Sequence, residues 1–205
     1  MITSILAIIS GLILTIIEKI GYFGIFILMT LQSYNIPIPS EIIMPFSGFL
    51  ASSGKLGFWP VVIIGTLGNL SGAYLSYATA RYLLKNGFRK KFMFLENLMS
   101  ERHLEIAENW FKRFGSISVF FGRMTPIVGT FISFPAGLSK MNIFKFLSFT
   151  FLGSLIWSYI LTRIGFILGE NWGSLEHYFR QFDYVILALI IAAIFLKIYN
   201  HRKRK

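Results

Sequence analysis

Long apolar stretches alternate along the chain with short polar breaks, and the lengths of these stretches differ. Leu56–Ala80 has no charged residue, and Met141–Leu168 is apolar over a similar length. A bilayer needs about 20 residues, so each predicts a spanning helix. Ile2–Ile17 predicts a helix that either spans the membrane or lies in its interface. Tyr184–Leu196 is shorter, and its flanking residues can extend it by snorkelling.

The apolar region between Ile20 and Gly54 is interrupted by two prolines. Pro37 and Pro39 remove backbone donors and push the residues before them out of the helical region. Ser40 can then cap a new helix with Glu41 in its first turn. That helix is too short to span, so residues 35–57 predict a re-entrant hairpin. One long kinked transmembrane helix is the alternative.

Residues 114–140 form a second apolar region that proline and glycine interrupt repeatedly. The interrupting residues are Pro126, Gly129, Pro135 and Gly137. Irregular backbone at membrane depth is tolerated only where it is buried in protein or lines a cavity. This region therefore predicts a second re-entrant hairpin.

Each of these two broken regions carries a single charge. Arg123 is the only charge in Phe114–Ser139, and Glu41 is the only charge between Ile20 and Gly54. An arginine at membrane depth must face protein, water or a bound anion rather than lipid. One guanidinium and one carboxylate, each in a proline-broken segment, predict a polar site inside the bilayer.

The composition agrees with a membrane protein. The chain has 205 residues, of which 55% are hydrophobic and 14% charged, whereas soluble domains carry about 25% charged residues. Its mean hydropathy is +0.64. The fold class that follows is all-α integral membrane, a polytopic helical bundle in one domain over 1–205. There is no cysteine and the three histidines lie far apart, so we expect no metal and no cofactor.

Basic residues gather in two places. Eight of the 20 fall between Arg81 and Arg113, and five between Lys197 and Lys205. The positive-inside rule assigns both places, and hence the C-terminus, to the cytoplasm. Residues 86–113 predict an amphipathic linker on the membrane. Anionic headgroups are the expected partner of the basic tail, with nucleic acid the disfavoured rival. No cleaved signal peptide is expected, because a positive n-region and a cleavage site are missing.

The two halves of the chain resemble each other. Each half has a proline-broken hairpin followed by a spanning helix that contains a glycine and, six residues later, a tyrosine: Gly68 and Tyr74 in one, Gly153 and Tyr159 in the other. Gly68 and Gly72 give the first helix a flat face for packing. The charge rule orients the halves oppositely, so we predict two opposed re-entrant hairpins in an inverted repeat, which is typical of secondary transporters.

The predicted organisation can be given by residue ranges. It comprises N-terminal helices over 1–34, the first hairpin over 35–57, a spanning helix over 58–85, the linker over 86–113, the second hairpin over 114–140, spanning helices over 141–169 and 183–199, and a cytoplasmic tail over 200–205.

Several short motifs in order along residues 20–172 resemble the DedA family, the bacterial branch of the VTT-domain membrane proteins. They are Pro37-Ile-Pro-Ser-Glu41, Pro45-Phe-Ser-Gly48, Gly68-x3-Gly72-x4-Tyr77-x2-Ala80-Arg81, Phe121-Gly-Arg123-Met-Thr-Pro126, Phe131-Ile-Ser-Phe-Pro-Ala-Gly137, and Gly153-x3-Trp157 with Gly165-x3-Gly169. Each motif alone is loose, but together they are specific.

The resemblance implies a lipid transporter of the bacterial cytoplasmic membrane rather than an enzyme. DedA-like proteins are associated with moving undecaprenyl phosphate, some relatives with phosphatidylethanolamine, and others with membrane-potential homeostasis. Membrane lipids are then the expected partners, a homodimer is left open, and nucleic acid is not expected.

The chain departs from the family pattern at two positions. Gln32 stands where relatives often have Glu, and Gly129 stands where they often have a second Arg. Because a buried charge without its partner is costly, joint loss indicates that these positions form a pair in relatives. Restoring one charge should then destabilise the protein more than restoring both. Arg163 either replaces the lost guanidinium or snorkels at a helix end.

These residues suggest a mechanism. Arg123 binds the lipid phosphate, with Arg163 as a second contact, because a guanidinium matches phosphate oxygens bidentately. Glu41 titrates and gates the step, with Gln32 in the gating region. The breaks that shape the hairpins are Pro37, Pro39, Ser40, Pro45, Pro126, Gly129, Pro135 and Gly137; the packing glycines are Gly68, Gly72 and Gly153.

Other interpretations remain open at this stage. Arg123 and Glu41 could simply pair to hold the hairpins together. An ion-coupled transporter without lipid cargo and a membrane scaffold are rivals from other classes. An enzyme acting on lipid phosphates would need clustered nucleophiles, which the membrane segments lack.

Overall fold

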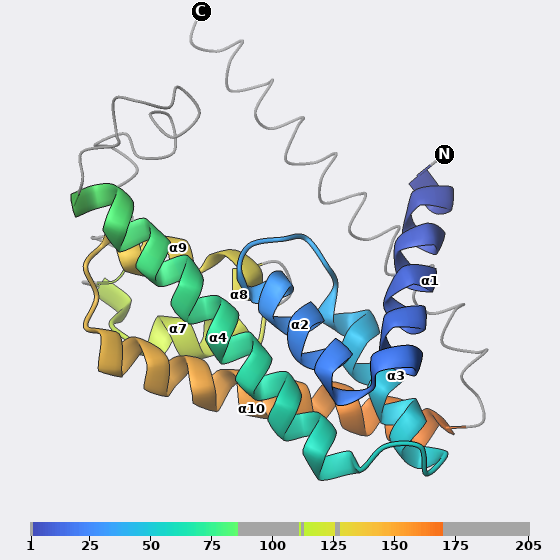
Figure 1. Ribbon diagram of the computed structural model, residues 1–205. Coiled ribbons are helices and arrows are strands. Elements are labelled where there is room, and N and C mark those ends of the chain that lie inside the picture. Colours follow the sequence, from blue (N-terminus) through green and yellow to red (C-terminus); the bar gives the residue numbers. More distant parts are fainter. Residues whose placement is uncertain (1, 86–110, 112, 126–127, 170–205) are drawn as a thin grey trace, which may run out of the picture. The chain divides into compact units, whose positions relative to one another are not determined.

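The computed structural model describes residues 2–85, 111, 113–125 and 128–169. In this part of the chain every regular element is a helix (Figure 1). The helices are α1 (Ile2–Ile20), α2 (Tyr22–Ser33), α3 (Ser40–Ser52), α4 (Phe58–Lys85), α7 (Ile117–Arg123), α8 (Val128–Phe131), α9 (Ser133–Leu138) and α10 (Ile143–Leu168). The all-helical class is therefore confirmed for the described residues.

Within the described ranges, two helices are long and apolar enough to cross a membrane. They run over Phe58–Leu83 in α4 and Ile143–Leu168 in α10, and both stretches are 26 residues long. At 1.5 Å per residue each is about 39 Å long, which exceeds the roughly 30 Å hydrocarbon core of a bilayer. The shorter apolar helices, Tyr22–Ser33 and Val128–Leu138, do not reach this length.

The chain divides into two compact units, Met1–Ile167 and Leu168–Lys205. The contacts described below lie within the first unit. The predicted amphipathic linker over 86–113, apart from residues 111 and 113, lies outside the described residues. So do the predicted last span over 183–199 and the basic tail over 200–205.

Three helices end with the same C-terminal capping motif. The residue after the helix cap adopts a left-handed conformation: Asn35 after α2 (φ 75°), Gly54 after α3 (φ 77°) and Lys140 after α9 (φ 56°). In each case the amides beyond the cap bond back to carbonyls of the last turn, as in a Schellman motif. Glycine and asparagine are usual there, and lysine is not.

The start of α3 differs from the prediction that Ser40 caps it. Pro39 is the N-cap, in extended conformation (φ −75°, ψ 117°), and Ser40 is the first helical residue with no capping bond from its side chain. The Pro39 carbonyl accepts the first turn's amide bond from Ile42 at 3.1 Å. The fixed φ of proline thus starts the helix.

The region predicted as the second hairpin contains three short helices. α7 ends at Arg123, and α8 starts at Val128. Pro126 lies outside the described residues. Pro135 is in the first turn of α9, where its missing amide removes no helical bond.

Glycines on the long helices let each pack closely on a short one. A Cβ added at Gly68 of α4 would lie 2.6 Å from the Phe26 carbonyl of α2, and Gly72, one turn on, meets α2 again. A Cβ at Gly153 of α10 would lie 2.8 Å from the Phe120 carbonyl of α7. Each contact is with backbone, which cannot move aside without shifting the helix.

Each long helix also packs on a second short helix through a glycine. A Cβ at Gly137 of α9 would lie 2.5 Å from the Tyr77 carbonyl of α4. At the α3–α10 crossing, a Cβ at Gly165 would overlap the Pro45 carbonyl, and one at Gly48 would overlap the Thr162 carbonyl. The four crossings therefore depend on small residues, as is typical of membrane helix packing.

Candidate functional site around Arg123

Arg123 is the centre of a buried polar cluster. It is the last residue of α7 and is only 3% exposed. Its Nη1 donates to Ser33 Oγ at 2.9 Å, Asn69 Oδ1 at 3.0 Å and the Gly129 carbonyl at 2.9 Å. Its Nη2 donates to Ser133 Oγ. One guanidinium therefore joins α2, α4, α8 and α9 to α7.

Further side chains extend this network. Gln32 Nε2 donates to Thr130 Oγ1 at 2.9 Å, and Asn69 Nδ2 lies 3.5 Å from Gln32 Oε1. Ser154 of α10 donates to Asn69 Oδ1 at 2.9 Å. Gln32, Ser33, Asn69, Thr130, Ser133 and Ser154 are all buried. We call these six residues, with Arg123 and Gly129, the arginine cluster.

The arginine cluster carries one positive charge and no negative charge. Arg123 makes no ion pair with Glu41 or with any other carboxylate in the part of the chain that the structure describes. Its Nε is buried and has no partner there. A buried charge is tolerated when hydrogen bonds compensate its lost hydration, and here neutral oxygens supply four of them. No described carboxylate neutralises the charge itself.

Glu41 lies outside this cluster. It is partly exposed in the first turn of α3. The structure thus does not bring Glu41 into hydrogen-bonding contact with Arg123.

Gln32 and Gly129, the two positions that depart from the family pattern, are close together. Gln32 bonds to Thr130, the residue after Gly129, and the Gly129 carbonyl accepts from Arg123. This proximity agrees with the hypothesis that relatives place a charge pair here.

Arg163 is not part of the cluster. It is exposed on α10, with its guanidinium carbon 5.8 Å from the centre of the Phe166 ring. It is nine residues beyond Ser154, which corresponds to about 14 Å along the helix axis. Any role for Arg163 must therefore be at a different depth from that of Arg123.

Pro37 and Pro39 lie in the turn between α2 and α3, next to the arginine cluster in sequence. Asn35 Nδ2 donates to Ser76 Oγ at 2.8 Å, which attaches this turn to α4. The prolines limit the conformations of a turn that follows directly on Gln32 and Ser33. Pro45, by contrast, lies inside α3 at the crossing with α10.

The sequence interpretation missed the neutral partners of Arg123. Five of the buried polar residues around Arg123 are not assigned to a site from the sequence: Ser33, Asn69, Thr130, Ser133 and Ser154. The signal was available for Asn69, because an asparagine in the middle of an uncharged spanning helix needs a polar partner. The serines and threonines gave no such signal, since a hydroxyl in a helix can bond to its own backbone.

The arrangement is suited to holding an anion rather than a metal. Among the described residues no three His, Cys, Asp or Glu side chains gather where they could hold a metal ion. A guanidinium surrounded by hydroxyl and amide groups can instead bind phosphate oxygens, because those groups can also donate hydrogen bonds.

Comparison with known proteins gives matches over most of the chain. Residues 38–167 match the VTT domain. Undecaprenyl phosphate transporter A of Bacillus subtilis (strain 168) is 32% identical over 188 residues, which cover 91% of this chain and 92% of that protein. The protein of the same name from Staphylococcus aureus (strain NCTC 8325 / PS 47) is 30% identical over 197 residues, with 92% and 95% covered.

A third relative has a different name. The alkaline phosphatase-like protein of Lactococcus lactis subsp. cremoris (strain MG1363) is 33% identical over 195 residues, with 90% of this chain and 87% of that protein covered. No solved structure matches the chain. With the VTT domain extending over more than half of its length, this chain belongs to the VTT-domain family, the DedA-like membrane proteins.

Proposed function

We propose that this protein moves a phosphate-headed lipid, undecaprenyl phosphate, across the bacterial cytoplasmic membrane. The observation that carries the proposal is the buried, unneutralised guanidinium of Arg123, within a cluster that can turn hydrogen-bond donors toward an anion. Two relatives that match over more than nine-tenths of this chain are named for transport of that lipid. Phosphatidylethanolamine or another phospholipid is the alternative cargo.

The matched helix crossings support an inverted repeat of two re-entrant hairpins. In one half α2 and α3 precede α4; in the other α7, α8 and α9 precede α10. Each long helix packs on the first short helix of its own half, α4 on α2 and α10 on α7. Each also packs on the last short helix of the other half, α4 on α9 and α10 on α3. This reciprocal exchange is what a two-fold pseudosymmetry would produce.

In this proposal the described conformation is a closed state. Ser33 and Ser133 both accept from Arg123: Ser33 ends α2, directly before the first proposed hairpin, and Ser133 lies on α9 in the second. If the hairpins separate, Arg123 loses these acceptors and gains access to a headgroup. The hydroxyls can then rotate to donate to the phosphate oxygens, so the site exchanges one set of hydrogen bonds for another. The lipid chains would stay in the bilayer.

Glu41 is proposed to act in gating or proton coupling from outside the arginine cluster. It stands on α3, which follows the turn attached to Ser33 of the cluster. Protonation of a partly buried carboxylate at the start of a helix would weaken its interaction with the helix dipole. Loss of coupling to a pH gradient in Glu41→Gln, with transport down a lipid gradient retained, would support this role.

The phosphatase name of one relative raises the possibility of hydrolysis, which the site does not favour. Serine hydroxyls lie beside Arg123, but a serine nucleophile needs an adjacent general base. The described members of the arginine cluster include no histidine, aspartate or glutamate. We therefore propose binding and transport rather than bond cleavage.

Arg123→Lys tests the proposal. A lysine has three donors and can still satisfy most of the acceptors around it, but it cannot bind phosphate through a planar fork. The full-length variant, reconstituted in proteoliposomes with and without a pH gradient, should retain its fold and lose most undecaprenyl phosphate transport. Arg113→Lys makes the same exchange at an exposed arginine outside the cluster and should transport normally.

Three outcomes distinguish the alternatives. Full transport by Arg123→Lys would limit Arg123 to a structural role. Transport of phosphatidylethanolamine but not of undecaprenyl phosphate by the wild type would change the cargo. No lipid movement under any gradient, together with proton or ion flux, would favour the ion-coupled transporter. Arg163→Lys in the same assay tests the second predicted phosphate contact.

A further inference from the structure

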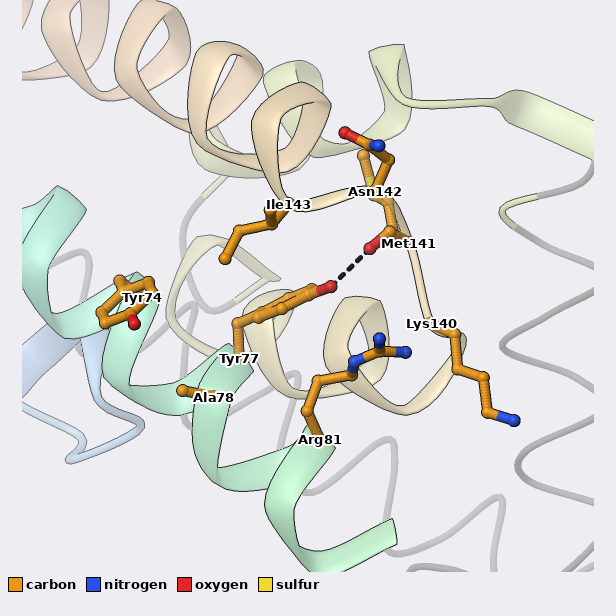
Figure 2. A pocket seen from close by; sticks show the side chains of 8 residues that line it. All are labelled: Tyr74, Tyr77, Ala78, Arg81, Lys140, Met141, Asn142 and Ile143. Carbon is orange, nitrogen blue, oxygen red and sulfur yellow. Dashed lines mark hydrogen bonds between the residues drawn. The ribbon is translucent and has the colours of Figure 1, made fainter. Parts of the chain in front are cut away.

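A pocket of about 550 Å³ lies away from the arginine cluster, between the C-terminal half of α4 and the turn that joins α9 to α10. Tyr74, Tyr77 and Arg81 line it from α4, and Lys140 and Asn142 line it from the turn. Figure 2 shows Arg81 extending from α4 toward this turn, with Lys140 on the same side of the pocket. Its volume is in the range of small-molecule sites.

The base of the pocket is held in place by packing. The Tyr77 hydroxyl donates to the Met141 carbonyl, the contact drawn in Figure 2. The Tyr77 ring stacks on Phe146 of α10 with 4.9 Å between the ring centres. Gly137 lies against the backbone of α4 directly below. The two walls therefore belong to one packed core and form a site before any ligand arrives.

The described residues give the pocket a positive charge. Among the described residues that line it, Arg81 and Lys140 are the only charged ones. Both are exposed, and neither makes an ion pair or hydrogen bond through its side chain to another residue in the described ranges. Asn142 caps the first turn of α10 by accepting from the amides of Phe144 at 3.0 Å and Lys145 at 3.2 Å. The positive end of that helix dipole adds to the field.

Lys140 stands where the backbone favours a different residue. It is left-handed (φ 56°) in the Schellman motif that ends α9, with its amide bonded to Gly137 O and that of Met141 to Ala136 O, both at 3.2 Å. Gly54 occupies the corresponding position after α3. Glycine at residue 140 would relieve the strain, so the lysine side chain is present against the local backbone preference. Strained residues of this kind gather at functional sites.

We propose that Arg81 and Lys140 form a second anion site that takes a phosphate group at the membrane surface. A guanidinium from α4 and an ammonium from the neighbouring turn suit a phosphate monoester or diester, the first binding in a fork and the second as a point charge. Arg81 is near the end of a helix long enough to span, so the site lies at headgroup level. The phosphate can belong to a lipid or be free in solution.

The test is a binding measurement on the full-length protein in a neutral detergent. The probes are dihexanoyl phosphatidic acid, dihexanoyl phosphatidylcholine and inorganic phosphate, and the readout is the affinity from isothermal titration calorimetry. Arg81→Gln with Lys140→Gln should weaken phosphatidic acid binding at least about tenfold. Lys55→Gln with Arg113→Gln removes the same charge at exposed sites outside the pocket and should leave the affinity unchanged.

A second variant separates binding from folding. Lys140→Gly removes one cation and also the backbone strain, so it should raise the melting temperature while weakening phosphatidic acid binding. Wild-type affinity in this variant would overturn the role of Lys140. Equal loss in the control pair would overturn the site, because total charge would then explain binding.

The probes also identify the source of the phosphate. Binding of phosphatidic acid that inorganic phosphate does not displace supports a lipid headgroup. Binding and competition by inorganic phosphate supports a free phosphate or phosphate ester. Equal affinity for phosphatidylcholine would overturn a site that depends on net negative charge. Because the readout is binding, these results do not depend on the transport proposed for Arg123.

Discussion

Restoring the family charges at residues 32 and 129 should have unequal and coupled effects on stability. The sequence predicts that either single restoration, Gln32→Glu or Gly129→Arg, is worse than both together. The structure changes this expectation for residue 32, because Arg123 already supplies a cation in the same hydrogen-bond network, so only Gly129→Arg alone should be worse than the double variant. A glutamate at residue 32 would therefore find a partner at once, whereas an arginine at residue 129 would meet a second positive charge.

The size of each effect follows from the contacts. Gln32 reaches Arg123 through Asn69, with contacts of 3.5 Å and 3.0 Å. A carboxylate at residue 32 would be within roughly 9 Å of the guanidinium, where an effective dielectric constant of about 20 gives an attraction of roughly 2 kcal/mol. Desolvation of the carboxylate opposes this gain, so Gln32→Glu should change the free energy of unfolding by less than about 1 kcal/mol.

Gly129→Arg should be far more destabilising. Its Cβ would lie 3.1 Å from the Arg123 carbonyl oxygen and 3.2 Å from that of Gly122, so the backbone must yield. Overpacking of this kind costs about 1–3 kcal/mol. Repulsion from Arg123 adds roughly 2 kcal/mol. In the double variant the carboxylate offsets that repulsion, so we expect a favourable coupling energy of about 2 kcal/mol.

The assay is a double-mutant cycle on melting temperatures of the purified protein in detergent. A coupling of about 2 kcal/mol corresponds to roughly 4–8 °C for a chain of this size. Gln32→Met, which removes the hydrogen bonds at this position without adding charge, controls for loss of the amide. Additive effects within about 0.5 kcal/mol would show that the two positions do not interact, and would refute the pair hypothesis.

Two further predictions concern packing and the arginine cluster. Gly165→Ala puts a Cβ into the Pro45 carbonyl at the α3–α10 crossing, so it should lower the melting temperature by roughly 5 °C or more. Gly11→Ala, which has open space around it, is the control and should not lower the melting temperature. Equal melting temperatures for the two variants would contradict the close packing at this crossing. Ser133→Ala should cost about 1–3 kcal/mol, because Nη2 of the buried guanidinium loses its acceptor, while Thr125→Ala, at an exposed position, should cost less than about 0.5 kcal/mol in the same thermal assay.

The long helices were the easiest part of the fold to predict. Long runs of apolar residues indicate them, so the helices expected over 58–85 and 141–169 have nearly the same bounds as α4 and α10. Local chemistry was harder to assign at the start of α3. Pro39 and Ser40 both favour a helix start. The backbone conformation in the structure shows that Pro39, whose φ is fixed, is the N-cap residue. Which helices cross could not be predicted, because glycine contacts depend on tertiary structure.

The candidate site was only half visible in the sequence. Arg123 stood out because a charge in an apolar region must be accounted for, and Gln32 stood out as a departure from a family pattern. Their neutral partners did not, since Ser33 and Ser133 are separated by a hundred residues and look like ordinary helix hydroxyls. The alternative that Arg123 pairs with Glu41 shows the same limit. Two isolated charges of opposite sign suggest an ion pair, but whether they form one depends on how close the fold brings them.

The partners of Arg123 in the arginine cluster are neutral, and this affects how easily an anion can enter the proposed site. If Arg123 were paired with a buried carboxylate, an arriving phosphate would have to displace a negative charge and would be repelled by it. Separating a buried ion pair costs about 3–5 kcal/mol. Ser33, Asn69 and Ser133 instead hold Arg123 with groups that can reverse their role and donate to the phosphate. On the proposed function, loss of the glutamate at residue 32 therefore favours anion entry, and Gln32→Glu should slow lipid transport even though it leaves the fold intact.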